Sequence, residues 1–462
     1  KDNSAYRYSF DMLGEAALTA EDAERYFSAY SDAITSIGGA SGSSEDVFSA
    51  PSISVKLSAL HPRYSWLQHD RVMSELVPRV QELARHAKES GIALTIDAEE
   101  SDRLEISLQV FEQVYRDAAL RDYEGLGLAV QTYQRRARAV IEFLVRAASE
   151  VGRRIPVRLV KGAYWDTEIK RAQEEGLSSY PVFTRKAHTD VSYLACARLA
   201  LGAAGELYPQ FATHNAHTLA SILHYAGSRQ DYEFQRLHGM GEELYAEVTD
   251  PDKFARPCRV YAPVGSHEDL LPYLVRRLLE NGANTSFVNR IVDETVDVEE
   301  IVADPLEVTR ARDFTPHPAI VAPADLFGDE RQNSAGINLP DANVSAPLLA
   351  AMQRAAESQY SAYPVVGGEA MQGAEVPSTN PADLSRVVGT CRQAEPAHVD
   401  RALGLAVAGQ TAWDATPAAD RAGVLNRAAD LYEQHASEPV SYTHLRAHET
   451  ADVISYAVFC LK

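Results

Sequence analysis

Eight short runs rich in β-branched and aromatic residues alternate with longer amphipathic runs over the first part of the chain. Short runs of this composition are typical of buried strands, and the longer runs have the 3.6-residue period of helices. One helical run, residues 71–91, ends in a glycine, which favours a helix stop. The predicted strands start at Tyr8, Ile53, Ala93, Gly127, Val157, Phe211, Glu233 and Arg259.

Strands that alternate with helices pair in parallel, because a helical crossover returns the chain to the same end of the sheet. Eight parallel strands is the number that closes a (β/α)8 barrel of the TIM type. A doubly wound sheet is the alternative, but no dinucleotide-binding G-x-G-x-x-G motif follows a predicted strand. We therefore expect an α/β chain that opens with a TIM-like (β/α)8 barrel.

The amino-acid composition of the sequence changes after about residue 290. Residues 291–347 are rich in proline, asparagine and aspartate, which predicts a linker or an extended connector. Short strands, turns and alanine-rich helices return over residues 348–439 and predict the start of a second α/β domain. We expect this second domain to be incomplete, and we assign residues 1–290 to the barrel.

Residues 440–462 differ in composition from everything before them. When these residues are back-translated, a permitted choice of codons spells two sequencing-library adapters in the order expected of them. We therefore interpret this segment as an adapter artefact and leave it out of the predictions for fold and site.

The bulk composition narrows the classes of function. The 462-residue chain has a net charge of −21 and no basic tract, which argues against binding to nucleic acid. Its four cysteines have neither disulfide nor zinc spacing, which is typical of a reducing cytoplasm. No run of the sequence approaches the length of a membrane span. We expect a globular cytoplasmic protein without a metal site.

Charged and polar side chains stand where the predicted strands end. In a barrel of this kind, the ends of the strands and the loops that follow them carry the chemistry. A purely structural core would place valine and leucine there, whereas several cations around one mouth favour an anionic ligand, a carboxylate or a phosphate. The residues at these ends are Lys56, Asp97, Glu99, Gln131, Arg158, Lys161, Thr213, His214, Leu237 and Tyr261.

Individual members of this set also have a structural interpretation. Asp97 and Arg158 can form an ion pair that only stabilises the fold. His214 and His217 resemble a metal pair, but carboxylate ligands are not evident near them in the sequence.

A helical run that follows the eighth predicted strand carries a polar stripe. Its members recur at helical spacing beside a leucine-rich face. The stripe is either a solvated face or a group of side chains that lies over the barrel mouth. It consists of Tyr273, Arg276, Arg277 and Glu280.

Residue patterns alone leave three classes of function open. A Schiff-base lyase or aldolase would use Lys56 or Lys161, desolvated at a strand end, as its nucleophile. A cofactor enzyme would use the surrounding cations to hold its cofactor and an acidic substrate. A carboxylate-binding module without catalysis is the third class.

Several motifs resemble those of a known family. They are SVKLSALHPRY, LTIDAEESDRLEISL, VRLVKGAYWDTEIKRAQ, FATHNAHT, FQRLHGMGE and YLVRRLLENGANTSFVNRI. Together they resemble the proline dehydrogenase domain of the proline utilization A family of bacterial bifunctional flavoenzymes, over about residues 6–290. The later residues 348–439, which contain STNPADLSRVVG, resemble the start of that family's aldehyde dehydrogenase domain.

The resemblance implies FAD-dependent oxidation of L-proline to 1-pyrroline-5-carboxylate, the first step of proline catabolism to glutamate, with hydride passing from proline C5 to flavin N5. It implies that the complete second domain oxidises glutamate semialdehyde with NAD, an activity that we do not expect from residues 348–439 alone. A quinone electron acceptor, peripheral membrane association of the reduced protein and a homo-oligomer of the longer protein are also implied. We expect no nucleic acid partner.

The resemblance further implies roles for individual residues. Asp97 would order the pocket and Arg158 would lie at flavin N5, and both would be catalytic. The substrate-binding residues would be Lys56, Arg276 and Arg277 at the carboxylate, with Tyr164, Leu237, Tyr261 and Tyr273 around the ring. The FAD-binding residues would be Ala98, Gln131, Arg158, Val160, Lys161, Gly162, Ala163, Trp165, Thr213, His214, Glu280 and Ser286.

Overall fold

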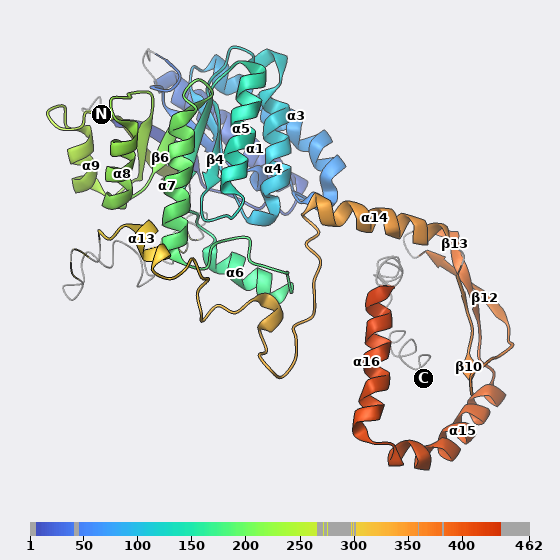
Figure 1. Cartoon of the computed structure of the whole chain (residues 1–462). Helices are drawn as coiled ribbons and strands as arrows, with labels where there is room; N and C mark the ends of the chain where they lie inside the picture. Colours follow the sequence, from blue (N-terminus) through green and yellow to red (C-terminus); the bar gives the residue numbers. More distant parts are fainter. Residues whose placement is uncertain are drawn as a thin grey trace. The chain divides into compact units, whose positions relative to one another are not determined.

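A computed structural model of the chain describes residues 6–40, 46–265, 271, 275, 297, 299, 302–358, 360–380 and 383–435. The chain separates into two compact units, Lys1–Asp341 and Ala342–Lys462 (Figure 1). The predicted adapter segment, residues 440–462, lies outside the described residues.

The first unit contains a closed barrel of eight parallel strands in the order of the sequence. The last strand pairs with the first, from Cys258 opposite Tyr6 to Val264 opposite Met12, so the sheet closes on itself. The predicted TIM-like barrel is therefore confirmed. Its strands are β1 (Tyr6–Met12), β2 (Ser52–Val55), β3 (Ala93–Ile96), β4 (Leu126–Gln131), β5 (Ile155–Val160), β6 (Leu207–Ala212), β7 (Glu233–Leu237) and β8 (Cys258–Val264).

Helices cover the outside of the barrel (Figure 1). The predicted helix stop is confirmed: Gly91 follows α3 with φ +69°, a left-handed conformation that glycine adopts without strain. The described helices of this unit are α1 (Ala20–Ala40), α2 (Leu57–Leu60), α3 (His69–Glu89), α4 (Leu104–Tyr115), α5 (Ala137–Val151), α6 (Trp165–Glu174), α7 (Lys186–Gly202), α8 (Ala216–Ala226), α9 (Glu242–Thr249) and α13 (Pro305–Arg310). Short 3-10 turns occur at Trp66–Gln68, Ser101–Arg103, Ala118–Leu120 and Pro323–Asp325.

A buried ion network occupies the barrel at the N-terminal ends of its strands. The Glu233 carboxylate, 0% exposed, accepts hydrogen bonds from Arg259 Nε at 2.6 Å and from Arg7 Nη1 at 2.9 Å. Arg259 also donates to the carbonyls of Phe48 and Ala50, which precede β2. Burial raises the pKa of Glu233, but the two guanidinium groups more than offset this and hold that pKa below its ordinary value. Since the chemistry of such barrels sits at the opposite end, we assign this network to stability.

Part of the predicted linker packs on the barrel. Residues 302–341 belong to the first compact unit. The Tyr180 hydroxyl donates to the Val321 carbonyl at 2.6 Å, and Arg185 Nε donates to the Thr315 carbonyl at 2.7 Å. This stretch is therefore attached to the surface between α6 and α7.

The second unit combines small sheets with helices. One sheet pairs β10 with β11, and the other has the order β12-β13-β9. Strands and turns had been predicted here, and the structure has them. The elements are α14 (Ala342–Glu357), β9 (Tyr360–Ala362), β10 (Val365–Val366), β11 (Glu369–Ala370), β12 (Glu375–Asn380), β13 (Asp383–Arg392), α15 (Pro396–Ala415) and α16 (Ala418–Gln434). Among the helices that the structure describes, none is long and apolar enough to cross a membrane.

Candidate active site

Four of the predicted residues meet inside the C-terminal mouth of the barrel. Lys56 follows β2 and Asp97 follows β3, while Arg158 lies in β5 and Tyr261 in β8. Asp97 is the centre of the group: Oδ1 accepts from Arg158 Nη1 at 2.6 Å, and Oδ2 accepts from the Tyr261 hydroxyl at 2.8 Å. Lys56 Nζ lies 3.8 Å from the same Oδ2.

A fifth residue, Asp11 of β1, completes this group. Its Oδ1 accepts from Lys56 Nζ at 2.6 Å, and the two side chains are only 2% and 7% exposed. We call Asp11, Lys56, Asp97, Arg158 and Tyr261 the mouth cluster. Sequence reasoning missed Asp11, although the alternating polar residues of YRYSFDM were a signal that one face of β1 points into the barrel.

The cations of the mouth are paired within the protein. Lys56 and Arg158 face Asp11 and Asp97, so the cluster holds two positive and two negative charges. Lys161 pairs with Asp190 at the rim. These three cations therefore have counter-charges within the protein, and the anionic ligand favoured by the sequence stays a prediction.

The charge state of Lys56 follows from its neighbours. Burial lowers the pKa of the amine, but the carboxylates of Asp11 and Asp97 outweigh it and raise that pKa above its ordinary value. Lys56 is therefore an ammonium group at neutral pH.

Arg158 is held on all sides. Nε donates to Gln235 Oε1 at 2.8 Å, and Nη2 donates to Ser54 Oγ at 3.0 Å and Ser9 Oγ at 3.2 Å. Its guanidinium carbon lies 4.9 Å from the centre of the Tyr261 ring. The side chain is 4% exposed, so its planar group is oriented before any ligand arrives. Its three polar partners were not named from the sequence.

Most of the predicted FAD-binding residues that the structure describes lie at the C-terminal ends of β4, β5 and β6 or just after them, and we call this part of the barrel the rim. Gln131 Oε1 accepts from Ala163 N at 3.4 Å, and Leu237 N donates to His214 Nε2 at 3.1 Å. Trp165 Nε1 donates to the Phe183 carbonyl at 2.9 Å. Val160 ends β5, and Thr213 follows β6.

The rim carries donor groups of the kind that a flavin dinucleotide can use. Its guanidinium, ammonium and amide donors suit phosphates and the polar edge of a flavin ring. Gly162 has φ +134°, and a Cβ there would lie 2.5 Å from the Tyr133 ring, so this turn of the rim needs a glycine. The residues present therefore fit FAD.

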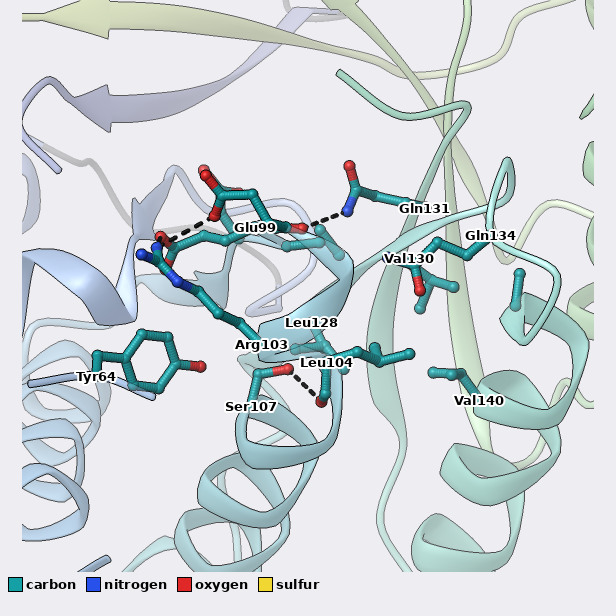
Figure 2. A pocket seen from close by; sticks show the side chains of 15 residues that line it. Tyr64, Glu99, Arg103, Leu104, Ser107, Leu128, Val130, Gln131, Gln134 and Val140 are labelled. Atoms are coloured by element: carbon teal, nitrogen blue, oxygen red, sulfur yellow. Dashed lines mark hydrogen bonds and ion pairs between the residues drawn. The ribbon is translucent and has the colours of Figure 1, made fainter. Parts of the chain in front are cut away.

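A small hollow lies beside the mouth, at the C-terminal ends of β3 and β4 (Figure 2). Ala98 lines it together with Tyr64, Glu99, Arg103 and Gln131. Figure 2 shows Arg103 joined to the Glu99 carboxylate and Gln131 joined to the Glu99 carbonyl.

The polar stripe after β8 and one further predicted residue cannot be placed. Tyr273, Arg276, Arg277, Glu280 and Ser286 lie outside the described residues. Within the described part of the chain, no group of three or more histidine, cysteine, aspartate or glutamate side chains is arranged to hold a metal ion.

Comparison with known families identifies both parts of the chain. The proline dehydrogenase family model matches residues 1–290, and the aldehyde dehydrogenase family model matches residues 369–457. The second match runs into the segment interpreted as an adapter, and that interpretation stays a prediction.

Individual relatives agree with these matches. The bifunctional protein PutA of Salmonella typhimurium is 50% identical over 461 residues, which cover 97% of this chain. Proline dehydrogenase 1 of Bacillus subtilis is 27% identical over 288 residues, covering 61% of this chain and 80% of that protein. A crystal structure of a proline utilization A (PutA) mutant from Bradyrhizobium japonicum superimposes with a TM-score of 0.83 at 45% identity, covering 95% of this chain and 41% of that one.

This chain spans only about 35% of the length of the Salmonella PutA relative. The match nevertheless includes the whole barrel and continues into the aldehyde dehydrogenase part. The predicted resemblance is confirmed: the chain belongs to the proline dehydrogenase family, and it joins the proline dehydrogenase barrel to part of an aldehyde dehydrogenase domain as the bifunctional PutA proteins do.

Proposed function

We propose that the barrel catalyses the FAD-dependent oxidation of L-proline to 1-pyrroline-5-carboxylate. The mouth cluster is the observation that carries the proposal. It is buried, balanced in charge and fixed by hydrogen bonds at the end of the barrel where such folds place their chemistry. Because the chain belongs to the proline dehydrogenase family, we propose proline as the substrate that this cluster receives.

The charge balance bears on how proline is held. A neutral cluster offers a substrate carboxylate no net attraction, so additional cations are required. We propose that Arg276 and Arg277 supply this charge together with the ammonium of Lys56. Two forked guanidinium groups can fix a carboxylate that is remote from the reacting carbon. Around the ring we propose Tyr164, Leu237, Tyr261 and Tyr273.

We propose that Asp97 and Arg158 act at the end of proline that reacts, which is C5. Asp97 holds the Arg158 guanidinium and the Tyr261 hydroxyl at 2.6 and 2.8 Å, so neither group has to reorient during the reaction. When bound, FAD would accept the hydride that leaves proline C5. Arg158 is proposed to lie at flavin N5. The residues proposed to hold the cofactor are Ala98, Gln131, Arg158, Val160, Lys161, Gly162, Ala163, Trp165, Thr213, His214, Glu280 and Ser286.

The Schiff-base lyase is the weaker candidate. A nucleophilic lysine needs a lowered pKa, because only the free amine attacks a carbonyl. The carboxylates around Lys56 raise its pKa instead. Lys161 is engaged by the carboxylate of Asp190.

The wider biology is proposed from the family alone. We propose a quinone as electron acceptor at the membrane, with peripheral association of a cytoplasmic protein and a homo-oligomer of the longer protein. NAD is proposed only for the complete aldehyde dehydrogenase domain, which would oxidise glutamate semialdehyde.

Two measurements on the purified chain separate the candidates. The proposed function predicts flavin absorption bands after purification or after incubation with FAD, and no covalent adduct on Lys56 or Lys161 when a carbonyl compound such as a 2-oxo acid is added together with borohydride. A folded protein that stays colourless with FAD would exclude the flavoenzyme, and a borohydride-trapped adduct on Lys56 or Lys161 would favour the lyase.

A further inference from the structure

A line of hydrogen bonds runs along the C-terminal rim of the barrel. It starts in the loop after β1, where Ala16 N donates to Ser58 Oγ at 3.0 Å and Ala17 N donates to the Ser58 carbonyl at 2.9 Å. Ser58 lies in α2, two residues after Lys56. Its own amide donates to Glu99 Oε1 at 3.0 Å. The loops after β1, β2 and β3 are thereby joined.

The same line continues from Glu99 across two further strands. Gln131 Nε2, at the end of β4, donates to the Glu99 carbonyl at 2.7 Å (Figure 2). Gln131 Oε1 in turn accepts from Ala163 N, in the loop after β5, at 3.4 Å. Within this line, Glu99 therefore accepts from Ser58 with its side chain and from Gln131 with its backbone carbonyl.

The Glu99 side chain is fixed by its own counter-charge. It is 6% exposed, and Oε2 accepts from Arg103 Nη1 at 2.6 Å (Figure 2). With one oxygen held by Arg103, the other is left to accept from the Ser58 amide. Glu99 comes two residues after Asp97, and Ser58 comes two residues after Lys56. The bond between them therefore links the two segments just beyond the ends of β2 and β3, which the backbone already pairs as far as Val55 and Asp97.

We propose that Glu99 is a positioning residue with two separable arms, resting on the proposed function above. The carboxylate arm holds the Lys56 segment, and with it the loop after β1, against the Asp97 segment. The carbonyl arm holds Gln131 and, through it, the loop after β5. The carboxylate arm thereby supports the binding of proline, and the carbonyl arm supports the binding of the cofactor.

Glu99→Gln separates the two arms. The backbone carbonyl is unchanged, so the bond from Gln131 persists. Of the two side-chain oxygens, one becomes an NH2 group that must face either Arg103 or the Ser58 amide, and both of these are donors. One of the two carboxylate contacts is therefore lost. Glu100→Gln is the matched control, because Glu100 also lies beside Arg103, at 3.2 Å, whereas the Ser58 amide donates to Glu99.

The test combines kinetics, cofactor titration and hydrogen exchange. A displacement of about 1 Å at a positioned group can cost roughly a hundredfold, so we expect Glu99→Gln to raise KM for proline by about tenfold or more, with a smaller change in kcat. Binding of FAD, followed by quenching of its fluorescence, should be unchanged. The amides of Ala16, Ala17 and Ser58 should exchange faster with deuterium in this variant and not in Glu100→Gln.

Several results would overturn the proposal. They are a wild-type KM and wild-type exchange in Glu99→Gln, equal effects of the two variants, or an increase in KM matched by an equal loss of FAD affinity, which would indicate general loosening. If the unmodified protein does not oxidise proline, the proposed function fails, but the exchange rates of the three amides still decide whether Glu99 holds this rim.

Discussion

Replacement of Asp97 by asparagine tests the centre of the mouth cluster. The asparagine has nearly the same shape, so Oδ1 can still accept from Arg158, while its NH2 group can donate to the Tyr261 hydroxyl oxygen. Packing is preserved and the negative charge is removed. The cluster then carries a net charge of about +1, because Lys56 and Arg158 keep their charges and Asp11 is the one carboxylate left in it.

The magnitude follows from two contacts. A hydrogen bond that involves a charged group is worth about 1.5–3 kcal/mol, and the bond from Arg158 loses part of this because its acceptor is no longer an anion while its donor stays charged. Lys56 also loses a carboxylate at 3.8 Å, which adds to the displacement of the cluster. Together we expect kcat with proline to fall by roughly ten- to a hundredfold. KM should not rise, because a more positive mouth attracts the substrate carboxylate more strongly.

Steady-state kinetics per mole of folded, flavin-loaded protein measure this effect, with the thermal midpoint recorded in parallel. Asp166→Asn is the control, because it replaces the same carboxylate by the same amide at an exposed position in the first turn of α6. A wild-type kcat in Asp97→Asn would refute the role of the cluster. So would a rise in KM alone.

Three further predictions concern the substrate, the fold and the end of the chain. Arg277→Met should raise KM for proline by roughly ten- to several-hundredfold, because one charge-assisted hydrogen bond of about 1.5–3 kcal/mol is lost. Pyrrolidine, which has no carboxylate, should lose far less activity, and equal losses for both amines would make the arginine structural. The folded-state pKa of Glu233 is depressed below its unfolded value of 4.5, so its contribution to stability is present above pH 4.5 and is lost as the pH falls through the folded pKa. Urea midpoints should therefore decline below pH 4.5, and Glu233→Gln should lower the unfolding free energy at pH 7 by about 3–5 kcal/mol; an unchanged midpoint would contradict this. Deletion of residues 440–462 should leave proline oxidation and thermal stability unchanged, and a cooperative loss of either would mean that the segment is genuine protein.

The barrel could be predicted because its signal is local and repeated. Each strand is a short apolar run, each helix has its own period, and the number of repeats selects the closed form. The exact start of β1 was not predictable in the same way. The predicted start is Tyr8, whereas β1 begins at Tyr6, because its first residues pair with Cys258 and Arg259 of β8. A strand boundary set by the closure of the barrel depends on residues at the far end of the domain.

The site was predictable to the extent that strand ends mark it. Lys56 and Asp97 follow their strands directly and were found. Arg158 and Tyr261 lie within their strands and were also found, whereas Asp11, near the end of β1, was missed. Its contact with Lys56 depends on the register of β1 against β2, in which Asp11 stands opposite Ser54. The alternating polar residues of β1 fit a strand with one wet face equally well. Only closure of the barrel turns that face inward and makes Asp11 a buried counter-charge.

The position of the abstracted hydride is the most direct test of the central proposal. The FAD-loaded protein is mixed with proline without oxygen, and loss of the flavin absorption band is followed in a stopped-flow instrument. Proline with deuterium at C5 should bleach the flavin more slowly than unlabelled proline, proline with deuterium at C2 should bleach it at the unlabelled rate, and the product should be 1-pyrroline-5-carboxylate. A flavin that proline does not bleach, or a rate that responds to deuterium at C2 instead of C5, would contradict the account.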